Sequence, residues 1–198
     1  MYVCLFPAIV RRRTAGPATG LALAALLAVT WLVPSTVHGG GVTATRLWGT
    51  VRSMPTGTRL VVVSPDQGSL QIRLLGVDLP EPPRAGSTGS VLEGQPFGAQ
   101  AESYARDLLL EKQVRLDAYG KDRAGRLLAV VWLGEINVNL TLVKEGLAWV
   151  DPSLTGTNVR AALEVAERQA RVGKYGLWGL PEPEPPWEYR KRYRLASE

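Results

Sequence analysis

Residues 72–81 read I-R-L-L-G-V-D-L-P-E, and the interpretation of the whole chain starts from this stretch. Its apolar residues, interrupted by Arg73, predict a buried strand. The strand leads through a glycine into two carboxylates, Asp78 and Glu81. Because arginine keeps its charge, a guanidinium within an apolar strand needs an anion beside it. That anion is either a neighbouring carboxylate or a bound phosphate.

A second arginine precedes another apolar strand. Residues 121–131 read K-D-R-A-G-R-L-L-A-V-V, which places Arg126 beside the strand predicted for residues 127–133. Two arginines and two carboxylates in one pocket suit phosphodiester chemistry, because a guanidinium binds two phosphoryl oxygens and stays charged. For each arginine alone, a structural ion pair is the simpler interpretation. Arg73 would then pair with one of the carboxylates that follow it, and Arg126 with Asp122.

These two segments resemble the staphylococcal nuclease family, in which an R-L-x-G-[IV]-D-x-P-E segment and a later D-R-x-G-R segment build the active site. The resemblance covers about residues 43–190. It continues, in the family's order, through Q-P-F-G at 95–98, V-N at 138–139, L-V-K-E-G-L-A-W at 142–149 and G-L-W at 176–178. The closing P-P-W-E-Y-R at 185–190 is similar to the tail of exported bacterial members. One such motif is weak, whereas six in order are strong.

The resemblance implies roles for five residues of this chain. Arg73 and Arg126 match the two catalytic arginines that bind the substrate phosphate. Glu81 matches the general base that orients water, Asp78 matches a calcium-ligating carboxylate, and Leu79 stands where a backbone carbonyl binds the metal. The implied activity is that of an endonuclease acting on DNA or RNA with little sequence preference, because such a site binds phosphate rather than base edges.

The sequence departs from the family pattern at two places. Active members carry a D-G-D-T turn that supplies a second metal carboxylate, but residues 55–58 read P-T-G-T, with Gly57 at the ligand position. The family's substrate-stacking tyrosines are replaced by D-P-S-L at 151–154. Calcium prefers several oxygen ligands. These losses bear on calcium affinity and catalytic rate, and not on the fold.

Two other functions use the same residues. One is a non-catalytic nucleic-acid or phosphate-binding module that keeps the arginines and has lost its metal. The other is a membrane-tethered interaction domain that uses the basic aromatic end, W-E-Y-R-K-R-Y-R from Trp187. The simpler interpretation of this end is a solvated tail with one aromatic anchor. The enzyme is favoured because binding alone gives no reason to keep Glu81 beside Asp78.

Composition limits the chemistry of the folded part. The only cysteine, Cys4, and the only histidine, His38, lie near the N-terminus. A domain after them has no disulfide, thiol nucleophile, histidine base or zinc-finger site. The net charge of +5 is accounted for by three arginines at 11–13 and by an end with four basic and two acidic residues. The part between is neutral, so net charge does not establish nucleic-acid binding.

Three parts are predicted. In residues 1–41 three arginines precede an apolar run, densest at 21–33, which indicates a signal peptide or an N-terminal membrane anchor. We therefore expect an exported protein, secreted or extracytoplasmic, that contacts a membrane only if this segment is retained. Residues 42–180 form the nuclease-like domain, and residues 181–198 form a proline-rich, basic aromatic tail. We expect a monomer.

The pattern predicts an α+β fold. Strands are expected at 42–53, 58–63, around Arg73, at 114–119 and at 127–133, and helices at 97–111, 140–145 and 158–172. Five strands and three helices in this order suit a five-stranded OB-fold barrel with three packed helices, which is also the fold that the resemblance implies. We expect the proline-rich residues 181–186 to be extended, and the loop at 82–94 to be mobile and to border the site.

Overall fold

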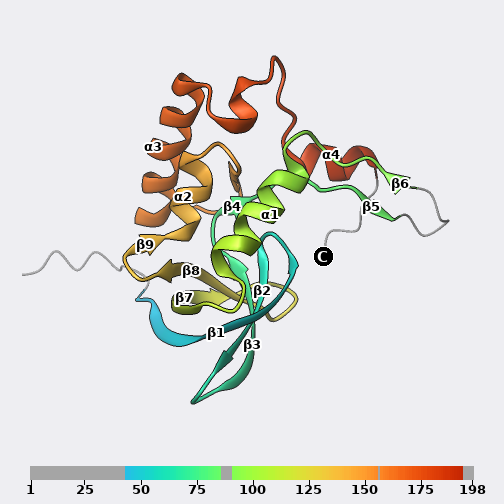
Figure 1. Ribbon diagram of the computed structural model, residues 1–198. Coiled ribbons are helices and arrows are strands. Elements are labelled where there is room, and N and C mark those ends of the chain that lie inside the picture. Colours follow the sequence, from blue (N-terminus) through green and yellow to red (C-terminus); the bar gives the residue numbers. More distant parts are fainter. Residues whose placement is uncertain (1–42, 86–90, 156, 194–198) are drawn as a thin grey trace, which may run out of the picture. The chain divides into compact units, whose positions relative to one another are not determined.

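The computed structural model of the chain describes residues 43–85, 91–155 and 157–193. The predicted N-terminal segment, residues 1–41, lies outside this part. The elements are β1 (Thr45–Thr56), β2 (Arg59–Ser64), β3 (Gly68–Leu74), β4 (Val77–Asp78), β5 (Arg84–Ala85), β6 (Val91–Leu92), α1 (Gly98–Leu109), β7 (Gln113–Lys121), β8 (Leu127–Leu133), β9 (Ile136–Asn137), α2 (Val138–Lys144), β10 (Trp149–Val150), α3 (Asn158–Gly173), the 3-10 helix η1 (Gly176–Gly179) and α4 (Pro186–Tyr193) (Figure 1). No helix in these residues has the length and apolar character needed to cross a membrane.

Five strands close into the predicted barrel. Their order is β3-β2-β1-β7-β8, with antiparallel neighbours, and β9 extends the sheet beyond β8. A parallel pairing between β3 and β8 closes the barrel and places Arg73 opposite Leu128. This is the OB-fold topology that the sequence predicts. This closure brings the two segments that carry Arg73 and Arg126 side by side where β3 pairs with β8.

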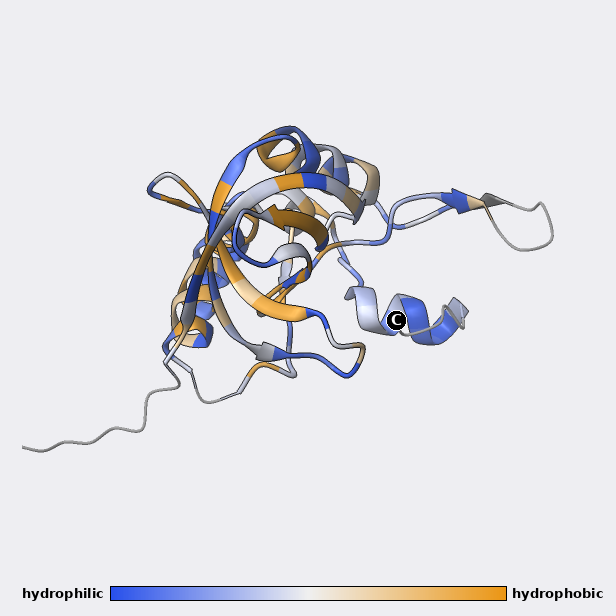
Figure 2. Ribbon diagram, turned by 90° about the horizontal axis from the view of Figure 1, so that it is seen from below, coloured by the Kyte–Doolittle hydropathy of each residue, from blue (hydrophilic) through white to orange (hydrophobic). Residues whose placement is uncertain are grey.

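Alternating side chains fill the barrel. In β2, Leu60 and Val62 are buried, and in β7, Val114 and Leu116 are buried, each separated by a more exposed residue. Figure 2 shows hydrophobic and hydrophilic segments following one another along some strands of the barrel, while another strand is hydrophobic along most of its length. The same core includes residues of α1 and α3, so the helices cover the barrel and extend its interior. The apolar surface removed from water is the main source of stability for this domain.

A buried amide connects α2 to the segment that leads to Asp78. Asn139 has no exposed surface, and its Oδ1 accepts a hydrogen bond from the backbone N–H of Val131 at 2.9 Å. Its Nδ2 donates to the carbonyl oxygens of Leu75, at 2.9 Å, and Ala129, at 3.2 Å. Because the amide oxygen and nitrogen of Asn139 are both hydrogen-bonded, the backbone segments that they contact are held in one arrangement. The V-N motif therefore fixes the turn between β3 and β4.

The C-terminal tail differs from the prediction. Residues 181–185 are not helical, as expected, but the chain then forms a fourth α-helix, α4. Pro186 is its first residue, a position where the fixed φ of proline suits a helix and its missing N–H is not needed. Tyr189 is buried, and the Trp187 ring lies 5.8 Å from that of Trp149. The expected aromatic anchor on the domain is present, whereas the helix was not expected. α4 is hydrophilic in Figure 2, and Glu188, Lys191 and Arg192 are exposed.

Candidate active site

A pocket of about 300 Å³ collects the five residues that the sequence singled out: Arg73, Asp78, Leu79, Glu81 and Arg126. Arg59, Arg84, Arg190 and Glu102 also line it. The lining therefore contains five arginines and three carboxylates, and two carboxylates outside the lining, Asp122 and Asp151, pair with two of these arginines. Guanidinium groups gathered on a concave surface suit a phosphate, because each can bind two phosphoryl oxygens.

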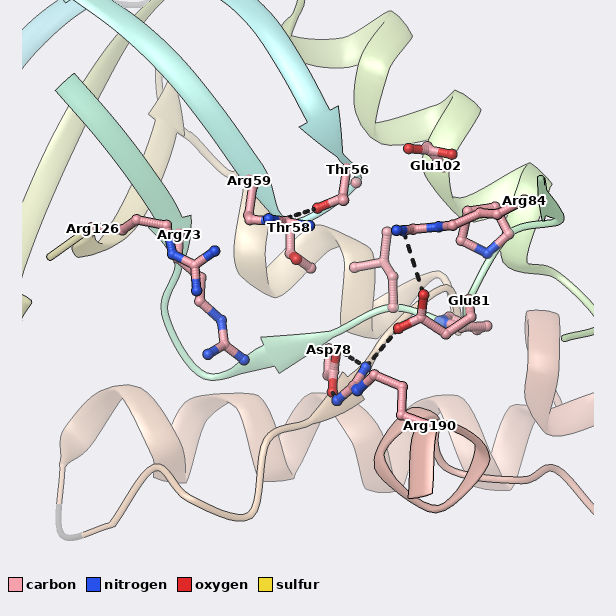
Figure 3. Close-up of a pocket in the computed structure, with 14 residues that line it drawn as sticks. Thr56, Thr58, Arg59, Arg73, Asp78, Glu81, Arg84, Glu102, Arg126 and Arg190 are labelled. Carbon is pink, nitrogen blue, oxygen red and sulfur yellow. Dashed lines mark hydrogen bonds and ion pairs between the residues drawn. The ribbon is translucent and has the colours of Figure 1, made fainter. Parts of the chain in front are cut away.

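The two predicted arginines lie together on one side of the pocket (Figure 3). Arg126 is buried, and its Nε donates to Asp122 Oδ2 at 2.7 Å. Arg73 Nη2 donates to Asp151 Oδ2 at 3.3 Å. The ion pair predicted between Arg126 and Asp122 is confirmed. The alternative pairing of Arg73 with the carboxylates that follow it is wrong, because its partner comes from the D-P-S-L segment next to β10.

Asp122 is held by the turn that contains its partner. Its Oδ1 accepts hydrogen bonds from the backbone N–H groups of Ala124, at 2.9 Å, and Arg126, at 3.0 Å. Burial raises the pKa of the Asp122 carboxyl, but the hydrogen bonds from Arg126 outweigh burial and the net pKa lies below the ordinary 3.8. The ionised carboxylate therefore holds the Arg126 guanidinium in one orientation at neutral pH.

The two predicted carboxylates lie on the other side of the pocket and share one cation. Arg190, which α4 supplies, points between Asp78 and Glu81 (Figure 3). Its Nη2 donates to Asp78 Oδ2 at 2.5 Å, and its Nη1 donates to Asp78 Oδ1 at 3.2 Å and to Glu81 Oε1 at 2.8 Å. Arg84 Nη2 lies 3.4 Å from Glu81 Oε2. Both oxygens of Glu81 therefore face an arginine.

Burial and ion pairing act in opposite directions on this cluster. Asp78 is only 7% exposed, and burial raises the pKa of its carboxyl above the ordinary value although Arg190 opposes the change. Burial also disfavours the charged form of Arg190, but its hydrogen bonds to Asp78 and Glu81 prevail and raise the pKa of the guanidinium. Arg190 is therefore a permanent cation, and its charge compensates the carboxylate that is farthest from solvent.

Gln95 holds Glu81 and the tail at the same time. Its backbone N–H donates to the Glu81 carbonyl oxygen at 2.7 Å, and its Oε1 accepts from the Glu81 N–H at 3.0 Å. Its Nε2 donates to the carbonyl oxygen of Glu184, just before α4, at 2.7 Å. Gly98 packs against the same place, since a Cβ there would lie 2.2 Å from the Glu81 carbonyl oxygen. The Q-P-F-G motif thus positions Glu81 and leads the tail to the pocket.

Comparison with known proteins agrees with this geometry. The sequence profile of the family described as staphylococcal nuclease homologue matches residues 71–179, which contain both arginines and both carboxylates of the sequence motifs. The chain belongs to the staphylococcal nuclease family. Its D-R-x-G-R motif supplies Asp122 and Arg126, and its R-L-x-G-[IV]-D-x-P-E motif supplies Arg73, Asp78 and Glu81.

Similar proteins are found in bacteria, fungi and plants. The chain is 30% identical to an uncharacterized endonuclease of Haemophilus influenzae over 139 residues, which are 70% of each chain. It is 32% identical to a thermonuclease of Staphylococcus intermedius over 120 residues, 60% of this chain and 68% of that protein. It is 31% identical to a probable endonuclease of Pyricularia oryzae over 159 residues. That match covers 76% of this chain and 58% of the fungal protein, so the chain spans less than two thirds of this relative.

Members of the staphylococcal nuclease family are generally calcium-dependent, but the donor set in this pocket does not fit a calcium ion. Gly57 lines the pocket without a side chain, and Arg190 engages both Asp78 and Glu81. A Cβ at position 57 would lie 2.6 Å from Leu79 Cδ2, so a carboxylate there requires this side chain to move. Across residues 43–85, 91–155 and 157–193, no group of three or more acidic, histidine or cysteine side chains is arranged to hold a metal. Calcium needs more oxygen ligands than this arrangement offers.

Sequence reasoning missed several residues of the site, among them Arg190, Asp151 and Arg84. Arg190 was treated as part of a solvated tail, and no role was expected for Asp151 or Arg84. The P-P-W-E-Y-R motif, which resembles the end of exported members of the family, was the signal for Arg190. For Asp151 and Arg84 the sequence contains no such signal, because their contacts depend on how the loops fold over the barrel.

Proposed function

We propose that the chain is a nuclease that hydrolyses phosphodiester bonds of DNA or RNA with little sequence preference. The observation that carries the proposal is the pocket in which Arg73 and Arg126 lie opposite Glu81, in a lining that contains five arginines. Phosphate is common to all nucleic-acid sequences, and guanidinium groups recognise it without contacting base edges. The endonuclease and thermonuclease names of the relatives support the same activity.

The arginines and Glu81 have different roles in hydrolysis. Arg73 and Arg126 bind non-bridging oxygens and neutralise the charge that develops on them in the transition state. Glu81 orients a water molecule and accepts its proton. The water oxygen bonds to phosphorus while the bond from phosphorus to the departing nucleoside oxygen breaks, and that oxygen takes a proton from solvent. Each carboxylate oxygen has two lone pairs, so Glu81 can accept from water while it contacts an arginine.

Calcium enters none of these steps. The family resemblance implies the metal, with Asp78 and the Leu79 carbonyl as its ligands, but the carboxylates present do not form a site for it. In the mechanism proposed here, Asp78 binds Arg190 instead. The charge that a metal would bring to the phosphate comes from the five arginines of the lining.

A second candidate function is a phosphate-binding module without catalysis. It is favoured by two contacts of Glu81: Arg190 Nη1 lies 2.8 Å from Glu81 Oε1, and Arg84 Nη2 lies 3.4 Å from Glu81 Oε2. Both oxygens that Glu81 would offer to a water molecule are thus in contact with cations. Under this function the same arginines bind nucleic acid, and no bond is cut.

Digestion of single-stranded DNA, duplex DNA and RNA by the purified protein separates the two functions. Each substrate is incubated with calcium and with EGTA, and Glu81→Gln is purified in parallel to reveal contaminating nuclease. Cleavage by the wild type that is lost in Glu81→Gln supports the nuclease. Binding of labelled oligonucleotide without cleavage in every condition supports the binding module.

We also propose that the domain acts outside the cytoplasm, as a soluble secreted protein or anchored by residues 1–41. The support is the arginine cluster at 11–13 before an uncharged apolar run. N-terminal sequencing of the protein recovered from culture medium and membrane fractions tests it. A mature N-terminus near residues 37–41 means secretion, an intact N-terminus in membranes means an anchor, and recovery of the full chain in the cytoplasm contradicts export.

A further inference from the structure

Arg190 occupies the space that a cation bound to the carboxylates would need. Its Nη1 and Nη2 lie 2.5 to 3.2 Å from both oxygens of Asp78, and Nη1 also contacts Glu81. A divalent ion held by Asp78 would lie about 2.3 to 2.6 Å from a carboxylate oxygen, which is the same space. The guanidinium and a metal ion therefore exclude each other while α4 is docked.

Contacts along the tail deliver Arg190 to this position. Before α4, the carbonyl oxygen of Glu184 accepts a hydrogen bond from the buried Gln95. Within α4, Trp187 packs edge-to-face on Trp149, and Tyr189 is 5% exposed. These anchors lie on both sides of the helix start and immediately before Arg190. The arginine is thus placed by packing and is not a mobile side chain that happens to reach the pocket.

Arg190 supplies the positive charge that a metal ion would otherwise bring to these carboxylates, at a site where Gly57 offers no ligand. Asp78 and Glu81 together carry two negative charges, and without a cation between them they would repel a phosphate at the Arg73 and Arg126 side. A divalent ion needs further oxygen ligands, which Gly57 does not supply, whereas a guanidinium needs only acceptors for its N–H groups. Arg190 finds three such acceptor contacts in the two carboxylates.

We propose that Arg190 is the resident cation of this site, in the place of a divalent metal, and that it positions Asp78 and Glu81 for metal-independent cleavage. This inference rests on the proposed nuclease function. Arg190 is a positioning residue: it holds the carboxylate that orients water and neutralises the one that would repel the substrate. The opposite role, in which α4 covers the site and blocks it, predicts different outcomes in the tests below.

The first test uses the wild-type chain alone. Its cleavage rate is measured in EGTA and in millimolar calcium, and calcium binding is measured by calorimetry. We expect equal rates in both conditions and no calcium binding at millimolar concentration. Cleavage that requires calcium would leave the nuclease function intact and overturn the inference. Absence of cleavage in both conditions would instead refute the proposed function, and calcium binding by the wild type would still refute the exclusion of metal by Arg190.

The second test removes the guanidinium. Arg190→Ala should cleave about 100-fold more slowly in EGTA, as expected when a catalytic group loses its position. Lys191→Ala, on the exposed side of the same helix, makes the same change in charge and should cleave at the wild-type rate. Added guanidinium ion at millimolar concentration should restore part of the Arg190→Ala activity and leave Lys191→Ala unchanged.

The same variants separate a cation role from a purely structural one. Arg190→Ala should bind calcium at least about tenfold more tightly than the wild type, because two carboxylates lose their cationic partner. Activity of Arg190→Ala at or above the wild-type level would show that α4 blocks the site and would overturn the proposal. A loss of activity that guanidinium does not restore would mean that Arg190 only docks the helix, and would overturn it too.

Discussion

The two sides of the pocket are built in different ways. On the side of Arg126, the partner is Asp122, four residues earlier in the same turn, and the parallel pairing of β3 with β8 brings Arg73 alongside. On the side of Asp78 and Glu81, the partner Arg190 is at least 109 residues away and reaches the pocket only because α4 docks. One side is made by the barrel, and the other is completed by the tail.

The arginines are positioned by the barrel alone, whereas the cation between the carboxylates comes from the tail. The arginine side consists of residues of the family motifs that the barrel alone brings together. The carboxylate side has Gly57, which offers no side chain, in its lining and a guanidinium from α4 between its two carboxylates. Variants on the two sides should therefore differ in kind: those on the arginine side weaken phosphate recognition, and those on the carboxylate side change turnover or the requirement for metal.

The largest effect is expected at Glu81. We predict that Glu81→Gln lowers turnover by about 100-fold to 10,000-fold, the usual contribution of a general base, while affinity for nucleic acid is retained. Cleavage rates and fluorescence anisotropy with a labelled oligonucleotide measure the two quantities separately. Glu102→Gln, in the same lining but on α1, is the matched control and should stay close to the wild type. A Glu81→Gln variant with the wild-type rate would remove this carboxylate from the mechanism.

On the arginine side, Arg126→Lys should reduce the cleavage rate by about 10-fold to 100-fold. An ammonium keeps the charge but cannot reproduce the planar fork of the guanidinium, and a lost hydrogen bond to a charged group is worth about 1.5 to 3 kcal/mol. Arg123→Lys, at an exposed position of the same turn, is the control. If both variants match the wild type in single-turnover kinetics, Arg126 serves only its ion pair with Asp122.

The docking of the tail can be weakened without touching the pocket. Trp187→Ala removes a half-buried ring that packs on Trp149, and we expect a loss of about 2 kcal/mol, less than the full cost of a completely buried tryptophan. For a chain of this size the melting temperature should fall by about 4 to 8 °C. Trp48→Ala, an exposed tryptophan of β1, provides the comparison and should change little.

Activity and stability must change together in Trp187→Ala if the tail completes the site. We expect its cleavage in EGTA to fall along with its melting temperature, because a loosened α4 holds Arg190 less firmly. A variant that loses stability but cleaves like the wild type would mean that the two sides of the pocket are independent.

The smallest effect is expected from Asp122→Asn. The pKa of Asp122 is lowered in the fold, so its ionised form stabilises the protein above the unfolded value of 3.8, and this stabilisation is lost as pH falls through the folded-state pKa. Asp122→Asn should therefore be less stable than the wild type at pH 7, and the two should converge below pH 3.8. Denaturant unfolding of both proteins across this range measures the difference. A difference in stability that does not depend on pH would contradict the role of the charge.

Much of the fold and one side of the site could be predicted from the sequence. The strand of β8 begins and ends where its apolar run does. The spacing of apolar residues in 158–172 predicts that Val159, Leu163, Ala166 and Ala170 are buried, and in α3 the last three are buried while Val159 is partly buried. Arg126 and Asp122 are four residues apart in one turn, so their pairing needs only local structure. α4 escaped prediction because eight residues with few apolar side chains do not form a periodic pattern, and its stability comes from docking.

The sequence by itself determined the barrel, three of the helices and the charged residues of the two main motifs, because hydrophobic periodicity and motif order are properties of neighbouring residues. Only the tertiary structure decided which charges far apart in the chain meet. Asp151 binds Arg73, and Arg190 takes the place between Asp78 and Glu81. The physical reason is that an ion pair depends on distance in space, and a docked tail brings together charges that no local pattern in the sequence connects.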